Sequence, residues 1–267
     1  MPELPEVETI VRGLRPLVRG RRITEVAVEW ARTVDASSLP LERLIGDTIV
    51  GVQRAGKFIV FELASGFRLA AHLRMTGRLM VTRTSGSVPY AKVILRLGRG
   101  GALIFADVRK FGRVRLFRGD CRQVLGIGVD PFDRGLDEAA FKKLLAGRRT
   151  PIKAWLLDQR RIAGIGNIYA AEALFYAGLR PRRRAGDLTA RQRGLLLKSL
   201  RQVLRRAIAH RGSSVDDYVD AEGNEGGFQN LLAVYGRAGS PCRRCQASVR
   251  RVLLAQRSTF YCPACQQ

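Results

Sequence analysis

The apolar positions of the chain follow two different periods. Between residues 5 and 18, Val7, Ile10, Val11 and Leu14 keep the i, i+3, i+4, i+7 spacing of an amphipathic helix. From residue 22 to residue 117 the apolar residues fall in short β-rich runs separated by turn signals. These runs cover residues 23–30, 48–54, 58–63, 68–73, 78–82, 92–97, 102–105 and 114–117. Many short strands at close spacing predict a β-sandwich or barrel that follows one helix.

The second half of the chain returns to helical periodicity. Residues 126–134 are rich in Gly, Pro and Asp, and we place a domain boundary there. The helical segments that follow cover residues 137–147, 152–159, 168–177 and 189–210. Thr189 and Gln192 form a capping box at the start of the longest of them. The pattern therefore predicts an α+β protein with a helical second domain.

Four of the five cysteines lie in two CxxC pairs near the end of the chain. Cys242 and Cys245 are separated from Cys262 and Cys265 by sixteen residues that suit a β-hairpin. Two such pairs can place four thiolates tetrahedrally around one structural zinc, and a redox pair is the alternative. The fifth, Cys121, is predicted to be a buried thiol. We expect three parts, which are a β-sandwich domain over residues 1–130, a helical domain over 131–236 and a zinc-finger hairpin over 237–267.

The charge balance narrows the range of partners. Lys plus Arg number 47 against 23 Asp plus Glu, which gives a net charge of +24. A globular chain this basic is expected to bind a polyanion, with nucleic acid ahead of a membrane surface. No apolar run approaches the roughly 20 residues of a spanning helix, and the start does not resemble a signal peptide. We therefore expect no membrane partner and a place inside the cell.

The first residues carry candidate chemistry. If Met1 is removed, Pro2 becomes the amino terminus and offers a secondary amine. An α-amino group titrates near pH ~8, against roughly 10.4 for lysine, so part of it is unprotonated and able to form a Schiff base. Glu3 and Glu6 follow in the first helical turn. The alternative is that Pro and Glu merely start a helix well.

A glycine-rich turn in the helical domain offers a second candidate site. Gly164-Ile165-Gly166-Asn167 fails as a dinucleotide loop, because Tyr169 stands at the third glycine position. A helix–turn–helix whose backbone N–H groups bind phosphate is the better interpretation, and ordinary capping by Asn167 is the alternative.

Several motifs together resemble one family. The chain contains, in order, PELPEVE, GKFIVFEL, HLRMTGRL, DVRKFG, AGIGNIYAAEALF, GGFQNLLAVYGRAGSPCRRC and QRSTFYCPACQ. They resemble bacterial formamidopyrimidine-DNA glycosylase from end to end. The sister family, endonuclease VIII, usually has glycine where this chain has Leu4, so it ranks second. The resemblance implies an N-terminal helix with a β-sandwich, and a C-terminal helix–two-turn–helix domain with a four-cysteine zinc finger.

The resemblance also implies an activity. The chain would remove oxidised purines, namely 8-oxoguanine and formamidopyrimidines, from damaged double-stranded DNA in base-excision repair, and nick the strand by β,δ-elimination. Pro2 matches the Schiff-base nucleophile and Glu3 the general acid/base. Lys57 matches a lysine that acts near the lesion phosphate and sugar. Arg257 matches the zinc-finger arginine tied to phosphate binding and strand elimination. One zinc and no redox cofactor are implied, and we expect a monomer in the bacterial cytoplasm, near the nucleoid.

The implied DNA contacts come from both domains. Met75, Arg109 and Phe111 match residues that fill the space left by an extruded base. Asn167 matches a phosphate-binding asparagine, and Arg149 stands where a DNA-contacting lysine is common. The alternatives are an endonuclease VIII-like enzyme for oxidised pyrimidines and a non-catalytic zinc-finger protein that binds damaged DNA.

Three residues depart from the family pattern. Lys92 stands where histidine is frequent, which would change a DNA contact. Asp216 stands where a basic residue is common, which bears on the preferred lesion. Gln246 replaces the glycine that usually follows the second zinc cysteine, which would alter the turn of the finger.

Overall fold

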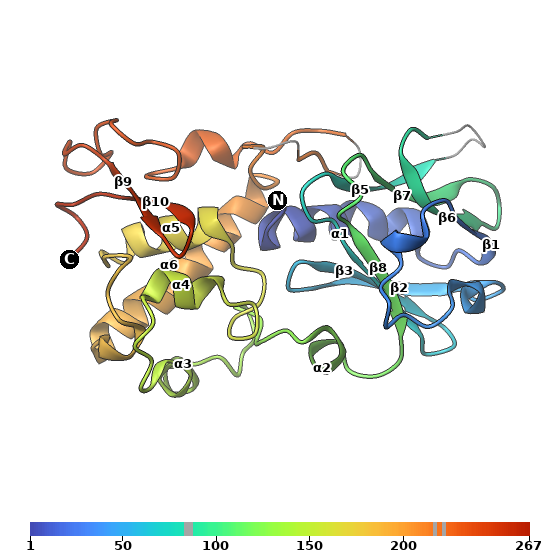
Figure 1. Cartoon of the computed structure of the whole chain (residues 1–267), viewed down its shortest axis with the longest axis horizontal. Helices are drawn as coiled ribbons and strands as arrows, with labels where there is room; N and C mark the ends of the chain where they lie inside the picture. Colours follow the sequence, from blue (N-terminus) through green and yellow to red (C-terminus); the bar gives the residue numbers. More distant parts are fainter. Residues whose placement is uncertain (83–87, 216–217, 221–222) are drawn as a thin grey trace. The chain divides into compact units, whose positions relative to one another are not determined.

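The structure is a computed structural model that describes residues 1–82, 88–215, 218–220 and 223–267. By their contacts the residues form two compact units, Met1–Leu125 with His210–Gly227, and Gly126–Ala209 with Phe228–Gln267 (Figure 1). We call them the N-terminal unit and the C-terminal unit. The division into three parts at residues 130 and 236 stays a prediction. Among the described residues, no helix has both the length and the apolar character needed to cross a membrane.

The N-terminal unit contains two four-stranded antiparallel sheets. One has the order β1-β6-β7-β5 and comprises β1 (Ile23–Val28), β6 (Ala91–Leu97), β7 (Ala102–Asp107) and β5 (Gly77–Thr82). The other has the order β2-β3-β4-β8 and comprises β2 (Ile49–Ala55), β3 (Phe58–Leu63), β4 (Arg68–His72) and β8 (Arg113–Phe117). Each run predicted as a strand overlaps one of these, and the two separate sheets confirm a sandwich.

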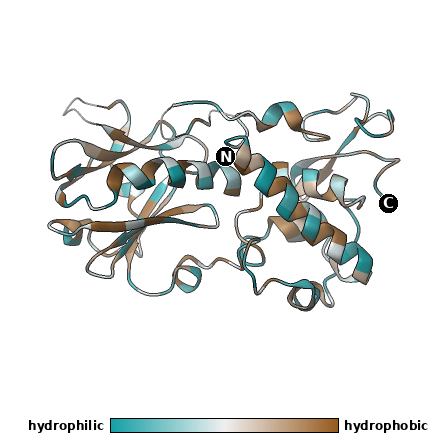
Figure 2. Ribbon diagram, turned by 180° about the vertical axis from the view of Figure 1, so that it is seen from behind, coloured by the Kyte–Doolittle hydropathy of each residue, from teal (hydrophilic) through white to brown (hydrophobic). Residues whose placement is uncertain are grey.

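Helix α1 (Leu4–Val18) packs on the sandwich through the apolar face predicted from its period. Val7, Val11 and Leu14 are fully buried in the same cluster as Phe61 of β3 and Phe105 of β7. Figure 2 shows hydrophobic residues along both the helix and the strands of this unit. The short elements of the unit are η1 (Ala31–Thr33), η2 (Leu41–Leu44) and α2 (Cys121–Leu125). The core shared by helix and sheets fixes the loops that carry the candidate site.

Cys121 corrects one expectation. It begins α2 and is only partly buried, against Val60, Ala70 and Phe117. None of the residues of this short helix is buried, so it covers the outer face of its sheet incompletely.

The C-terminal unit is built from helices and one hairpin. Its helices are α3 (Glu138–Leu145), α4 (Ile152–Leu157), α5 (Asn167–Tyr176) and α6 (Ala190–Ala209), with the 3₁₀ turns η3 (Ala185–Asp187) and η4 (Phe228–Leu231). Helix α5 is almost entirely buried and packs on α4, α6 and the hairpin. The hairpin pairs β9 (Arg250–Leu254) with β10 (Arg257–Tyr261). The predicted helical segments and hairpin are thereby confirmed.

Candidate functional site

The start of the chain is buried and tied down by a capping box. Glu3 is the N-cap of α1 and is 3% exposed. Its carboxylate accepts from the backbone N–H of Glu6, and Glu6 Oε2 accepts from the backbone N–H of Glu3 at 2.8 Å. Pro2, which is also buried, therefore sits directly before a fixed carboxylate. The helix-start interpretation is therefore confirmed, and the chemical one stays a prediction for the same residues.

Glu6 joins the start of the chain to the segment that follows α6. Its Oε1 accepts from the backbone N–H of Ser213 at 2.8 Å. Gly212 has φ +81° and a Cβ there would lie 2.7 Å from Glu6 Oε1, so a side chain at this position would displace the carboxylate. The Tyr218 hydroxyl donates to the carbonyl of Arg211 at 3.1 Å. Burial, followed by the charge of Glu6, raises the pKa of Tyr218, so the hydroxyl stays protonated.

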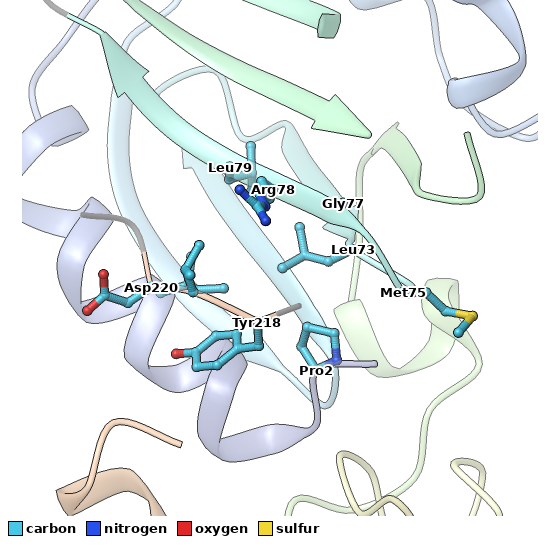
Figure 3. A pocket seen from close by; sticks show the side chains of 10 residues that line it. Pro2, Leu73, Met75, Gly77, Arg78, Leu79, Tyr218 and Asp220 are labelled. Carbon is cyan, nitrogen blue, oxygen red and sulfur yellow. The ribbon is translucent and has the colours of Figure 1, made fainter. Parts of the chain in front are cut away.

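A small pocket lies beside Pro2. Its lining includes Pro2, Leu73, Met75, Gly77 and Tyr218, all within the N-terminal unit. Figure 3 shows the ring of Pro2 beside the side chains of Tyr218 and Leu73. Its walls are mixed, because Arg78 and Asp220 line it together with the apolar residues. A nucleophile placed at such a pocket can meet a substrate atom.

Lys57 and His72 form a buried basic pair. Lys57 follows Gly56 (φ +59°) in the two-residue turn between β2 and β3 and is only 6% exposed. His72 Nδ1 accepts from the backbone N–H of Arg74 at 3.0 Å, so the ring proton belongs on Nε2. Burial, with the positive charges of Arg74 and Lys57, lowers the pKa of His72 to about 3. The imidazole is therefore neutral at physiological pH.

Met75, Arg109 and Phe111 are exposed, and Arg109 contacts the other two. Met75 is 44% and Phe111 49% exposed. An Arg109 guanidinium N–H lies 3.3 Å from Met75 Sδ, and the guanidinium carbon is 4.9 Å from the Phe111 ring centre. We call these three residues the wedge. Large apolar side chains left in solvent around a cation suit contact with base faces, whereas a core role for Phe111 is wrong.

In the C-terminal unit, two side chains converge on the strand that begins at Arg257. Asn167 Nδ2 and Lys153 Nζ each donate to the carbonyl of Ser258 at 3.0 Å, and Lys153 also donates to Thr259 Oγ1 at 2.7 Å. Gly166, not Asn167, is the N-cap of α5, so the capping alternative is wrong. Arg257 itself is exposed. The hairpin is thus held from the helical domain one residue away from this arginine.

Sequence reasoning missed two buried charged residues of this unit, Lys153 and Glu172. Lys153 is 1% exposed and Glu172 is fully buried. The Glu172 carboxylate accepts from the backbone N–H groups of Ala233, Val234 and Tyr235 at 2.8–2.9 Å. Burial raises the pKa of Glu172, although these three donors oppose the shift. A lone acid among the apolar residues of α5 was the only signal in the sequence.

The four paired cysteines come together as the spacing predicts. Their Sγ atoms all lie within 4.8 Å of one another. Cys242 and Cys265 are 3.9 Å apart at Sγ, and Cys245 and Cys262 are 3.5 Å apart. Tetrahedral zinc with Zn–S bonds near 2.3 Å requires Sγ–Sγ separations of about 3.8 Å, so these residues fit the metal. All four positions are taken by protein, which makes the site structural.

The chain matches known proteins along its whole length. Models of the formamidopyrimidine-DNA glycosylase N-terminal and H2TH domains match residues 1–114 and 127–219, and a model described as a zinc finger found in FPG and IleRS matches 239–267. The formamidopyrimidine-DNA glycosylase of Desulfitobacterium hafniense (strain Y51) is 43% identical over 277 residues, with 100% of both chains covered. That of Chloroflexus aggregans is 44% identical over 273 residues, covering 100% of this chain and 98% of the relative. The chain belongs to the formamidopyrimidine-DNA glycosylase family.

Solved glycosylases share the fold. The crystal structure of MutM (Fpg) from Thermus thermophilus has a TM-score of 0.89 at 41% identity, with 99% of this chain and 98% of that chain covered. The complex of Lactococcus lactis Fpg mutant G226P with DNA containing Fapy-dG has a TM-score of 0.89 at 36% identity, with both chains fully covered. The resemblance to the glycosylase family rather than to endonuclease VIII is confirmed, as is the zinc-finger fold.

Family membership identifies the metal that the four cysteines of this glycosylase bind. The zinc-finger match covers Cys242, Cys245, Cys262 and Cys265, whose geometry fits zinc. They hold one structural zinc, and the redox-pair alternative is set aside. Gln246, next to the second of them, has φ +65° and its N–H donates to the carbonyl of Cys242 at 3.0 Å. Gln246 thus takes a left-handed backbone conformation that usually favours glycine, and an altered turn stays a prediction.

The remaining predicted DNA contacts of this glycosylase differ in exposure. Arg149 is exposed in the connection between α3 and α4. Lys92 lies at a register shift of β6 and is only 7% exposed, less than expected for a surface phosphate contact. Both stay predictions. Asp216 lies outside the described residues.

Proposed function

We propose that this glycosylase excises oxidised purines, 8-oxoguanine and formamidopyrimidines, from duplex DNA and then nicks the strand as an AP lyase. The observation that carries the proposal is the placement of Pro2 at a pocket, directly before the fixed carboxylate of Glu3. The complex of the Lactococcus lactis relative with DNA containing Fapy-dG supports the substrate class. We further propose that it acts as a monomer in the bacterial cytoplasm, near the nucleoid.

The proposed chemistry begins at the freed amine of Pro2. Its lone pair forms a bond to the sugar C1′, the glycosidic bond breaks, and the base leaves with a proton that Glu3 delivers. The proline nitrogen then releases its N–H proton, and its electron pair opens the C1′–O4′ bond while O4′ takes up a proton, which gives an iminium. The iminium acidifies the C2′ proton, so β-elimination breaks the C3′–O bond and δ-elimination breaks the C5′–O bond.

The other residues act on the DNA rather than on the bond. Lys57 and Arg257 supply positive charge for phosphate groups, and Asn167 and Arg149 add contacts from the C-terminal unit. The wedge of Met75, Arg109 and Phe111 fills the space of the extruded base and offsets part of the cost of unstacking, which is a few kcal/mol.

Borohydride trapping on lesion duplexes tests the covalent step. The wild type should form a stoichiometric adduct at Pro2, whereas Pro2→Gly should lose both base release and most of the adduct. The trapped fraction should not exceed the fraction of chains that lack Met1, measured by mass spectrometry of the same preparation, since a peptide-bonded proline has no lone pair to offer. An adduct that persists in Pro2→Gly and maps to Lys57 would contradict the assignment.

Two further measurements separate the alternatives. Glu3→Gln should still bind lesion DNA but fail to release the base, because proton transfer is lost. Excision rates compared on 8-oxoguanine, formamidopyrimidine and thymine-glycol duplexes should favour the two purines. A preference for thymine glycol would indicate the endonuclease VIII-like activity, and binding without any base release would indicate a non-catalytic protein.

A further inference from the structure

A buried carboxylate lies under the two loops that carry the wedge. Asp107 is the last residue of β7 and is 1% exposed. Its Oδ1 accepts from the Thr76 hydroxyl at 2.6 Å and from the backbone N–H of Arg109 at 3.2 Å. Its Oδ2 accepts from the backbone N–H of Gly112 at 2.7 Å. One side chain therefore fixes both ends of the segment that contains Arg109 and Phe111.

The far end of this segment lies against the carboxylate without room for a side chain. A Cβ at Gly112 would come 2.4 Å from the Phe105 ring and 3.2 Å from Asp107 Oδ2. Between the two bonded ends, Lys110 has φ +60°, a conformation that a lysine adopts only when its surroundings hold it. Lys110 is held by its own contacts, because its Nζ lies 4.1 Å from the Trp30 ring centre and its carbonyl accepts from Arg113 at 3.2 Å. The bonds to Asp107 fix the two ends of the loop.

Thr76 connects this loop to the other one. Its hydroxyl donates to Asp107 and also lies 3.3 Å from the backbone N–H of Arg109, from which it accepts. Thr76 directly follows Met75 in the chain. The loop of Met75 and the loop of Arg109 and Phe111 are therefore joined by one hydrogen-bonded group, Asp107 with Thr76. The two loops are separated by about 30 residues of sequence.

We propose that Asp107 and Thr76 are positioning residues that hold the wedge in its working arrangement before DNA binds and thereby set discrimination of the base opposite the lesion. The proposal rests on the proposed function of Met75, Arg109 and Phe111. Donors that read a base edge must be held to within about 0.5 Å, and a loop ordered beforehand loses less entropy on binding. Asp107 supplies fixed acceptors for the loop of Arg109 and Phe111. Thr76, bonded to the same carboxylate, holds the adjacent Met75 in position relative to that loop.

Thr76→Val tests the link, because it removes the hydroxyl and keeps the shape, and Thr76→Ser is the matched control that keeps the hydroxyl. The ratio of kcat/KM for a lesion opposite cytosine to that opposite adenine should fall about tenfold in Thr76→Val, as expected for losing a hydrogen bond to a charged group. Thr76→Ser should stay within about twofold of wild type. Trapping at a pre-formed abasic site should change less than about twofold in both, because the Pro2 chemistry does not use Thr76.

Two outcomes would overturn the positioning role. One is an unchanged opposite-base ratio in Thr76→Val. The other is an equal loss on lesion and abasic duplexes, which would mean a general defect. Failure of the wild type to trap any adduct would contradict the proposed function instead, and the two failures are therefore distinguishable.

Amide hydrogen exchange in the wild type tests the hydrogen bonds to Asp107 without any variant. The N–H groups of Arg109 and Gly112 should exchange at least about a hundredfold more slowly than that of Lys110, an exposed residue between them, because both donate to a buried carboxylate. Equal exchange rates for the three amides in DNA-free protein would refute the pre-formed wedge. This measurement needs no activity, so it holds even if the substrate assignment fails.

Discussion

The two units present an exposed arginine in different ways. In the N-terminal unit, Arg109 projects from a loop on a sandwich whose core joins α1 to both sheets. In the C-terminal unit, Arg257 projects from a hairpin whose own strands bury only Thr259 and Phe260. A large apolar core fixes a loop with a few hydrogen bonds, whereas a short finger with few apolar residues needs a metal to fold. The glycosylase thus positions one arginine with an apolar core and the other with a bound metal.

Removing zinc should break this comparison most strongly. Structural zinc contributes about 10–16 kcal/mol of apparent folding free energy in isolated fingers, so chelation should unfold the hairpin and detach Arg257 from its support. DNA affinity should fall by at least about tenfold. The N-terminal unit, which holds none of the four metal-binding cysteines, should keep its thermal transition.

The zinc experiment has a matched control in the fifth cysteine. Cys262→Ser should reproduce the effect of chelation, while Cys121→Ser, a change far from the cluster in sequence and only partly buried, should not. Metal analysis should give one zinc per wild-type chain. A zinc-free chain that retains wild-type DNA affinity and slow exchange in β10 would refute the dependence.

Acid should lower the free energy of unfolding of the N-terminal unit through His72, a buried and neutral histidine. The zinc finger, whose metal ligands are all cysteines, has no such residue among them. The ordinary pKa of histidine is about 6.5, and that of folded His72 is about 3. Between these values the unfolded state binds a proton and the folded state does not, so stability falls as pH falls. The loss should be about 1.4 kcal/mol per pH unit between pH 6 and 4.

His72→Asn isolates this contribution to the pH dependence. Its Oδ1 can accept from the N–H of Arg74 as Nδ1 does, but it has no proton to gain. Denaturant unfolding of both proteins from pH 7 to 4 should give curves that converge as the pH falls. Parallel curves would mean that His72 is protonated in the folded state.

Much of the fold was predictable because it depends on local patterns. The helical period of α1, the alternating runs of the sandwich and the CxxC spacing each reflect geometry within a short stretch. The buried charges were not predictable in this way. Lys57 is a typical exposed turn residue by sequence, yet it is 6% exposed, and Lys153 finds its partner 105 residues away in the carbonyl of Ser258. A backbone acceptor leaves no trace in the sequence.

In the candidate site too, the residue identities could be predicted from the sequence and their contacts could not. The resemblance supplied the identities of Met75, Arg109 and Phe111, but nothing in the sequence indicated that Arg109 contacts the other two. The Asp107 carboxylate beneath them serves donors from two loops, and such a pairing depends on the register of β5 against β7. Register is a property of the assembled sheet, and a run of alternating residues does not specify it.

Phe111→Ala should separate the contribution of the exposed loop to excision from the contribution of the core to stability. Because Phe111 is 49% exposed, its loss should change the free energy of unfolding by less than about 1 kcal/mol, whereas Phe61→Ala in the core should cost about 3–5 kcal/mol. Excision of a paired lesion should slow about tenfold in Phe111→Ala, and cleavage at a pre-formed abasic site should slow less, since no base remains to be unstacked. Equal slowing on both substrates, or a core-like loss of stability, would contradict the wedge.

The smallest expected effect concerns the turn of the zinc finger. Gln246 is exposed and holds φ +65°, where a side chain costs roughly 1 kcal/mol that glycine does not incur. Gln246→Gly keeps the N–H that donates to Cys242, so it should raise the stability of the zinc-loaded finger by about 0.5–1 kcal/mol. Gly239, at φ +82° with open space around its Cβ position, supplies the reverse test, and Gly239→Ala should lower stability by a similar amount. Zinc affinity, measured by competition with a chelator, should rise in the first variant and fall in the second. Should Gln246→Gly instead bind zinc more weakly, contacts of the glutamine side chain would outweigh its backbone strain, and the finger would owe its shape to more than the metal.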